Sequence, residues 1–215
     1  MNKKYSYIGI AFIILLFGIY TVPKVVSRFQ DSGLVKFNKV PDFEFIDQER
    51  KTITNKDYQG KVYVVEFFFT TCPTICPLMN KKMLILQDEF FGNPQFGIAS
   101  ISITPNIDTP DLLKEYAKNN KITHKNWHLL TGKPDDVVLA LSNQGFKLPA
   151  GQGNDEDHGG MYHSGNFALV DKDGYMRSRR DEFGNPIFVY RALDEFELEN
   201  QIKELKEDIK LLLNE

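Results

Sequence analysis

The sequence predicts an α/β sandwich domain behind a single N-terminal transmembrane helix. Three observations lead to this prediction. Residues 7–22 are apolar or aromatic except for Thr21. Further along, short runs of β-branched and aromatic residues alternate with segments of helical periodicity, which is the order of strands joined by crossover helices. The two cysteines of the chain, Cys72 and Cys76, lie where a long apolar run, residues 62–69, gives way to a helical segment.

Residues 1–26 are predicted to form an uncleaved membrane anchor. The apolar stretch is near the lower limit of the about 17–25 residues that a span requires, but it lacks the polar face of a buried core helix. A cleaved signal peptide is the main alternative, although no small-x-small cleavage site follows the stretch. Lys3 and Lys4 favour a cytoplasmic N-terminus and export of the rest. Because there is no arginine-rich, acid-poor transit segment, we expect a bacterial inner membrane, a single pass and a periplasmic domain.

Residues 27–38 are expected to be a juxtamembrane spacer, and residues 39–215 one globular domain. That length suffices for a substantial hydrophobic core. The formal net charge is −3, and because the first 30 residues carry four positive charges and no acid, the rest of the chain is near −7. Phosphate binding needs a basic footprint, so this charge excludes nucleic acid as a partner.

The strands of this domain are predicted from local patterns. They are expected at residues 43–46, 62–69, 96–103 and 127–131, with a β-hairpin at 167–171 and 175–179. The run 62–69 is almost continuously β-branched or aromatic, which is typical of a strand covered on both faces. Residues 172–174, Lys-Asp-Gly, would form the turn of the hairpin.

Four helices are expected: from Pro77 to about residue 90, from Pro110 through Ala117, over residues 135–143, and from about residue 193 to the C-terminus. Proline is favoured in the first turn of a helix, which suits Pro77 and Pro110. Asp108 or Thr109 would cap the second helix. The last helix is amphipathic. This order of elements matches a thioredoxin-like α/β sandwich.

The cysteines form the motif Cys72-Pro73-Thr74-Ile75-Cys76-Pro77. Residues four apart share one face of a helical turn, so the two sulfurs can converge on one bound atom or on each other. A helix N-terminus also lowers thiol pKa and favours the thiolate, the form that binds metals or attacks disulfides. The pair is therefore a metal site, a redox pair, or both. In an oxidising compartment it would need a metal or a thiol reductant to stay reduced.

One of the four histidines stands out. His124 and His128 flank Trp127 near a predicted strand, where packing or surface roles are expected. His163 instead precedes the strand at 167–171, in a loop that faces the cysteine turn in a thioredoxin-like fold. Thioredoxin-type oxidoreductases place a cis-proline there, and this chain has no proline between residues 149 and 186. Two thiolates and one imidazole suit cuprous copper.

Three motifs together carry a family resemblance. They are the cysteine motif after its aromatic strand, Ile-Thr-Pro-Asn-Ile-Asp-Thr at residues 103–109, and His163-Ser164 leading into residues 169–174. In this order, over roughly residues 41–210, the chain resembles the Sco/SenC family. These are membrane-anchored copper chaperones for assembly of the CuA centre of cytochrome c oxidase.

The resemblance implies a thioredoxin-like copper-binding domain over residues 39–215, with Cys72, Cys76 and His163 as copper ligands. Three groups would bind Cu(I), whereas Cu(II) would need a fourth group or water. Asp108 corresponds to a family aspartate near the site. It would either orient the ligands or neighbouring backbone, or simply cap a helix.

The segment 151–163 is glycine-rich and acidic, and the family pattern does not explain it. Such loops are often functional. Our hypothesis is that Met161 or His158 supplies a transient extra ligand during copper handover, because a weak thioether ligand aids transfer. The alternative is a solvated loop without a ligand.

The resemblance implies a membrane-anchored copper metallochaperone that delivers copper to the CuA site in subunit II of cytochrome c oxidase, with a copper donor and a thiol reductant as further partners. A role in reducing the acceptor's cysteines is compatible with the same dithiol. Whether the protein is an enzyme therefore stays open, and the interpretation that it is not an enzyme is favoured.

An extracytoplasmic thiol–disulfide oxidoreductase, with Cys72 and Cys76 as its redox pair, is the alternative function. Its activity should survive loss of His163, whereas a metal site should not. A copper-responsive or redox-signalling protein would share the same ligands. A peroxidase is disfavoured, because Phe69 stands where the loop of a peroxidatic cysteine carries threonine. Zinc is disfavoured because closed structural zinc sites take four protein ligands and only three are assigned.

Overall fold

The computed structural model describes residues 3–27, 32–153, 161–193 and 201–215. The chain divides into two compact units, Met1–Ser32 with Asn214–Glu215, and Gly33–Leu213. The first unit consists mainly of helix α1, Lys3–Ser27. The second holds the sheet, the other helices and both cysteines.

The N-terminal segment is helical, but the structure does not support the transmembrane helix that we predicted within residues 1–26. Among the described residues, no helix has both the length and the apolar character that crossing a membrane requires. The physical reason is that the apolar stretch of α1 is short: a span takes about 17–25 residues, and polar residues flank residues 7–22 on both sides. Apolar side chains such as Ile13 and Phe17 are exposed on this helix.

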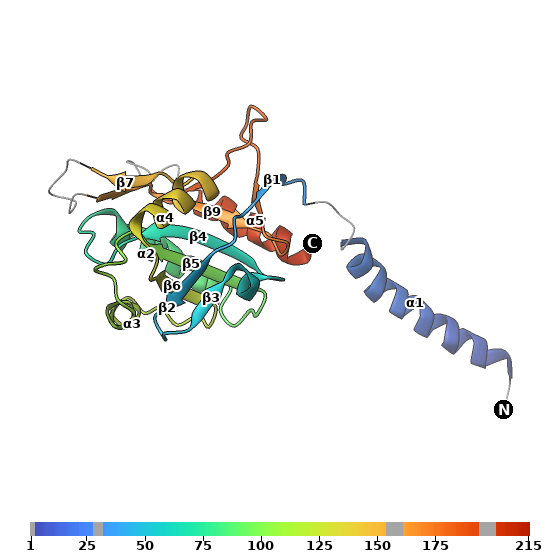
Figure 1. Ribbon diagram of the computed structural model, residues 1–215. Helices are drawn as coiled ribbons and strands as arrows, with labels where there is room; N and C mark the ends of the chain where they lie inside the picture. The colour runs from blue at the N-terminus through green and yellow to red at the C-terminus, as the bar shows by residue number, and fades with distance from the viewer. Residues whose placement is uncertain (1–2, 28–31, 154–160, 194–200) are drawn as a thin grey trace. The chain divides into compact units, whose positions relative to one another are not determined.

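The main sheet has nine described strands, in the order β1-β10-β9-β4-β5-β6-β2-β3, with β11 pairing with β9 (Figure 1). Their bounds are β1 Val35–Lys39, β2 Glu44–Asp47, β3 Thr52–Thr54, β4 Val62–Phe68, β5 Phe96–Ser102, β6 Trp127–Thr131, β9 Asn166–Val170, β10 Tyr175–Ser178 and β11 Tyr190–Arg191. Strands β4, β5 and β6 are parallel and central, and antiparallel strands flank them. A separate two-stranded sheet joins β7, Ala150–Gln152, to β8, Met161–His163.

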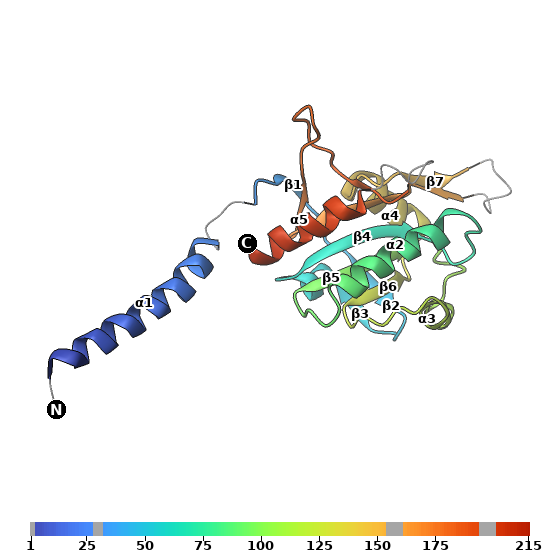
Figure 2. The same ribbon diagram turned by 180° about the vertical axis from the view of Figure 1, so that it is seen from behind.

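Helices cover both faces of the main sheet. Helices α2, Ile75–Glu89, and α5, Ile202–Asn214, lie on the face turned to the viewer in Figure 2. Glu89 of α2 forms ion pairs with Lys206 and Lys210 of α5, which confirms that these helices are neighbours. Helix α4, Asp135–Ala140, continues as a π-helical turn to Gly145 and lies on the other face (Figures 1 and 2).

Helix α3 spans Pro110–Asn119, and its N-terminus decides between the two caps considered above. Thr109 is the N-cap, because its hydroxyl oxygen accepts a hydrogen bond from the backbone N–H of Leu112 at 3.4 Å. The proline in the first helical position leaves no N–H unsatisfied there. Asp108 is therefore free for another role.

The predicted strands and the first three predicted helices are present within a few residues of their expected bounds, and the sheet has further strands. The last helix was expected from about residue 193, but helix α5 begins at Ile202, and residues 194–200 lie outside the described part of the chain. Strand β1 lies in the segment that we assigned to the spacer 27–38, where it pairs with β10 from Val35 onward. Its alternation of apolar Val35 and Phe37 with polar neighbours is the strand signal in that segment. Strand β3 and a 3-10 helix, Asn55–Tyr58, follow β2 in a region for which no element was predicted.

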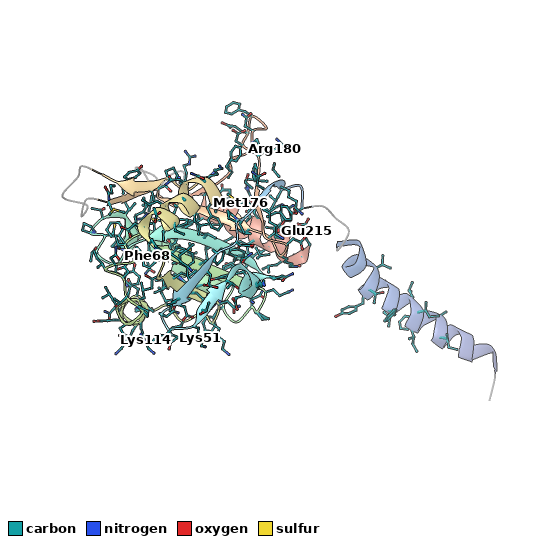
Figure 3. All side chains as sticks on the ribbon, in the orientation of Figure 1. Lys51, Phe68, Lys114, Met176, Arg180 and Glu215 are labelled. Atoms are coloured by element: carbon teal, nitrogen blue, oxygen red, sulfur yellow. The ribbon has the colours of Figure 1, made fainter. Side chains whose placement is uncertain are left out.

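The core lies between the sheet and its helices. All seven residues of β4 and of β5 are buried, as a strand covered on both faces requires. Figure 3 places Phe68 and Met176 within the domain and Lys51 and Lys114 at its surface, which agrees with their burial. Because β4 is buried along its whole length, its C-terminal end, where the cysteine loop begins, is held within the core.

A buried carboxylate ties α5 to the sheet. Asp208 is 1% exposed and accepts hydrogen bonds from Nε and Nη2 of Arg179, both at 2.8 Å. The hydroxyl of Tyr190 donates to the same carboxylate at 2.6 Å. Breaking a buried network of this kind is costly because the remaining groups lose their partner.

We expect Asp208→Asn to lower the free energy of unfolding by about 2 kcal/mol, because an amide cannot accept all three charge-assisted hydrogen bonds. Glu207→Gln is the matched control: Glu207 lies 3.1 Å from Arg179, but its side chain is half exposed, and its loss should cost less than about 1 kcal/mol. Urea unfolding of the full chain measures both. Equal losses would contradict this account of how α5 is attached.

Candidate metal centre

The cysteine loop connects the end of β4 to the start of α2. Cys72 lies in the loop and Cys76 in the first turn of the helix, and both are free and buried. The backbone N–H of Cys76 contacts the Cys72 sulfur at 3.5 Å. Thr74, the N-cap residue, makes no side-chain capping bond. The Cys72 sulfur thus receives an N–H of the helix N-terminus, where negative charge is favoured.

His163 reaches the cysteines from a different part of the chain. It is the last residue of β8 and is opposite Ala150 of β7. Its Nε2 lies 2.9 Å from the Cys76 sulfur, and its Nδ1 lies 3.3 Å from the backbone carbonyl oxygen of Ser164. The imidazole packs edge-on against the ring of Phe69, with centroids 5.7 Å apart. The contact at Nδ1 leaves Nε2 as the ligand atom, the usual arrangement in metal sites.

The three predicted ligands come together as expected. One ligand atom from each of Cys72, Cys76 and His163 lies within 4.8 Å of the other two, and all three residues are buried. Two sulfurs and one imidazole nitrogen form a soft donor set that fits cuprous copper. The residues present therefore fit the metal that their chemistry implies.

The two thiols differ strongly in acidity. The hydrogen bond from the Cys76 thiol, helped by His163 and by backbone N–H groups, lowers the pKa of Cys72 to about 3 although burial opposes this change. The same hydrogen bond, together with burial, raises the pKa of Cys76 well above its usual value. At neutral pH the free pair therefore holds one thiolate, on Cys72, and one proton, on Cys76.

The Asp108 carboxylate anchors the start of the cysteine loop through hydrogen bonds. It is fully buried, and its carboxylate accepts hydrogen bonds from the backbone N–H of Thr70, at 3.2 Å, and from the Thr70 hydroxyl. It also accepts from the hydroxyls of Ser102, at the end of β5, and Thr104. Thr70 is two residues before Cys72, so the carboxylate links the loop to the neighbouring strand. Sequence reasoning missed Thr70 and Ser102, because nothing local marks a partner that is distant along the chain.

Of the two proposed accessory ligands, Met161 and His158, the structure describes only Met161. Met161 begins β8, is partly buried against the core, and lies two residues before His163. Alternate residues of a strand share one side, so Met161 and His163 lie on the same side of β8. His158 lies outside the described residues.

The other two histidines pack elsewhere, as expected. A ring nitrogen of His124 lies 3.3 Å from the carbonyl oxygen of Phe90, and the ring is buried. Nδ1 of His128 lies 3.1 Å from the carboxylate of Asp47. Neither belongs to the cysteine–histidine group.

Fold and site together define a thioredoxin-like protein with a buried Cys–Cys–His ligand group. Comparison with known proteins agrees: the family model for SCO1/SenC matches residues 33–196, and the chain belongs to this family. It is 33% identical over 137 residues to the SCO1 protein homolog of Bacillus subtilis (strain 168), covering 63% of this chain and 70% of that protein. It is 29% identical over 140 residues to a putative copper-binding protein of Stutzerimonas stutzeri, covering 64% and 67%.

A solved structure agrees with the fold. BsSco, a member of the Sco family of cytochrome c oxidase assembly proteins in which a disulfide switch was identified, superposes with a TM-score of 0.67 at 26% identity. The match covers 84% of this chain and 95% of that one. The thioredoxin-like architecture is thereby confirmed.

The pKa of Cys72 predicts how it reacts. Because Cys72 is a thiolate above about pH 3, its alkylation by iodoacetamide should be almost independent of pH between about pH 5 and 8, whereas an ordinary thiol speeds up about tenfold per pH unit below its pKa near 8.5. Cys76 should react far more slowly. Mass spectrometry of the reduced full chain measures both sites, and a tenfold rise per unit at Cys72 would contradict the assignment.

Proposed function

We propose that this Sco protein is a copper metallochaperone that delivers copper to the CuA site in subunit II of cytochrome c oxidase. The observation that carries the proposal is the convergence of Cys72, Cys76 and His163 within 4.8 Å. Family membership supports it, as do a similar protein described as copper-binding and a similar structure from an oxidase assembly protein. Copper is the cargo of this reaction.

Delivery would proceed by ligand exchange. Three protein groups suit Cu(I), and a low coordination number leaves room for an incoming ligand. Thiolate, imidazole or thioether groups of the acceptor would attack the bound ion while the bonds to Cys72, Cys76 and His163 break in turn. Cu(II) would require a fourth group or water. The donor set disfavours closed structural zinc, which generally takes four protein ligands.

A thiol–disulfide exchange function is the second candidate, and the acidity of Cys72 favours it. A low-pKa thiolate beside a protonated second thiol is the arrangement that attacks disulfides and then resolves the mixed disulfide. A thiol reductant would have to regenerate the pair. Such chemistry would act on the acceptor's cysteines before copper arrives, or serve redox signalling.

Membrane attachment and a periplasmic location belong to the same proposal. They are supported by the apolar residues 7–22 and by the exposure of side chains such as Ile13 and Phe17 on α1. The proposal is attachment through this segment, without a statement that it spans the bilayer. Recovery of the full chain in carbonate-washed membranes tests it, and complete release by the wash would contradict it.

The copper site makes a direct prediction for His163→Ala. The full chain should bind one Cu(I), and the variant should bind it at least about 100-fold more weakly, because losing a ligand costs more than the roughly 10–100-fold lost with an outer contact. Competition with a chromophoric Cu(I) chelator under anaerobic conditions measures the affinity.

The matched control is His128→Gln, because His128 lies beside Asp47 and outside the ligand group. Its Cu(I) affinity should equal that of the unchanged chain. If His163→Ala bound copper as tightly as the control, copper transfer would be rejected in favour of dithiol exchange, since thiol exchange does not need the imidazole.

The accessory-ligand hypothesis concerns transfer more than binding. Replacing both Met161 and His158 by alanine should slow Cu(I) transfer to an acceptor chelator severalfold, because a transient thioether or imidazole ligand assists handover. Met83→Leu, at a fully buried position of α2, is the control and should leave the rate unchanged. Unchanged affinity and rate in the double variant would reject the hypothesis.

A further inference from the structure

A turn of π-helix precedes the small sheet of β7 and β8, which carries His163. Helix α4 continues into the π-helical turn Leu141–Gly145, where the N–H of Phe146 donates to the carbonyl oxygen of Leu141 at 3.0 Å. Helix α4 and strand β7 lie on the same side of the domain in both views (Figures 1 and 2). Because π-helical turns are rare and frequent at functional sites, the contacts of this turn call for an explanation.

Ser142 in this turn binds the backbone just before β7. The residue is fully buried, and its hydroxyl donates to the carbonyl oxygen of Leu148. In the opposite direction, the N–H of Leu148 donates to the carbonyl oxygen of Ser142 at 3.0 Å. Lys147, with a positive φ of 57°, reverses the chain between them, as residues at helix C-termini commonly do. Two hydrogen bonds therefore hold the segment that enters β7.

Asn143, the next residue of the turn, binds the first residue of β7. Its carboxamide oxygen accepts a hydrogen bond from the N–H of Ala150 at 3.2 Å, and its Nδ2 donates to the carbonyl oxygen of Ala150 at 2.8 Å. The same Nδ2 donates to the carbonyl oxygen of Leu139 in α4 at 2.8 Å. The carboxamide thus satisfies both backbone groups of Ala150, as a neighbouring strand would, and ties β7 to α4.

Ala150 is the residue directly opposite His163 in the small sheet. At the adjacent position of the ladder, the N–H of Ser164 donates to the carbonyl oxygen of Pro149 at 2.8 Å. Hydrogen-bonded and non-hydrogen-bonded pairs alternate along an antiparallel ladder, so Ala150 and His163 form a non-hydrogen-bonded pair, whose side chains are close. Both side chains are buried on one face of this sheet, so a shift of Ala150 would displace the imidazole.

We propose that Ser142 and Asn143 are positioning residues for the copper ligand His163. They tie the start of β7 to the end of α4, and Ala150 passes this constraint across the ladder to His163. The imidazole is thereby held with its Nε2 at 2.9 Å from the Cys76 sulfur. Groups behind a ligand commonly orient it in this way. The inference deepens the copper-binding part of the proposed function and rests on it.

Asn143→Ala in the full chain tests the proposal. The variant should bind Cu(I) about tenfold more weakly than the unchanged chain, at the low end of the loss expected when a group behind a ligand is removed. Competition with a chromophoric Cu(I) chelator under anaerobic conditions measures the affinity. Ser142→Ala breaks the other attachment and should weaken binding similarly. Asn143 lies at the surface, so its variant decides the question if the buried serine variant does not fold.

A spectroscopic measurement follows the imidazole without copper. The rings of His163 and Phe69 pack edge-on with centroids 5.7 Å apart, so a nuclear Overhauser effect should connect their protons in the reduced, copper-free full chain. In Asn143→Ala this effect should weaken relative to the one between the core rings of Phe90 and Phe96, whose centroids are 4.7 Å apart. A merely structural loss of stability would not change the ratio of the two effects.

Asn126→Ala is the matched control. It removes the same side chain and two hydrogen bonds from Nδ2, to the carbonyl oxygens of Pro94 at 3.2 Å and Phe96 at 2.9 Å, outside the ligand group. It should leave the Cu(I) affinity and the ratio of the Overhauser effects unchanged.

The inference is overturned if Asn143→Ala keeps the affinity or the Overhauser ratio of the unchanged chain, or if the Asn126 control loses as much affinity. Failure of the proposed function has a different signature. A full chain that bound no Cu(I) would reject copper transfer, whereas the copper-free Overhauser effect would still decide whether Asn143 positions His163.

Discussion

The contact between the Cys76 sulfur and the His163 imidazole is the interaction on which the site depends, because it joins segments 87 residues apart. The cysteines follow the C-terminal end of the central parallel strand β4, whereas His163 lies in β8 of the separate two-stranded sheet. Neither segment alone offers more than two soft ligands. The fold therefore creates the third coordination position, and this position separates a metal site from a simple dithiol.

The paired parallel strands β4 and β5 constrain the position of the cysteine loop that makes this contact. Strands β4 and β5 pair in register over seven residues, from Val62 opposite Phe96 to Phe68 opposite Ser102, and both strands are buried throughout. At their carboxyl ends the Asp108 carboxylate binds Thr70 and Ser102, so the cysteine loop starts from a constrained point. Ligand sites in α/β proteins commonly lie at this edge of the sheet.

Sequence reasoning predicted the elements with strong patterns and missed those without. The continuous apolar run at residues 62–69 and the strand at 127–131 are clear because their residue types and flanking turns agree. The three-residue strands β7 and β8 are too short to show periodicity, although they place His163. The ligand types were readable from the cysteine spacing and the family resemblance. The partners of Asp108 arise only from tertiary packing.

X-ray absorption at the copper edge of the Cu(I)-loaded full chain tests the central claim most directly. We predict a first shell of two sulfur atoms and one imidazole nitrogen, from Cys72, Cys76 and His163, and loss of the nitrogen in His163→Ala. A first shell without sulfur, or one that His163→Ala leaves unchanged, would contradict the account.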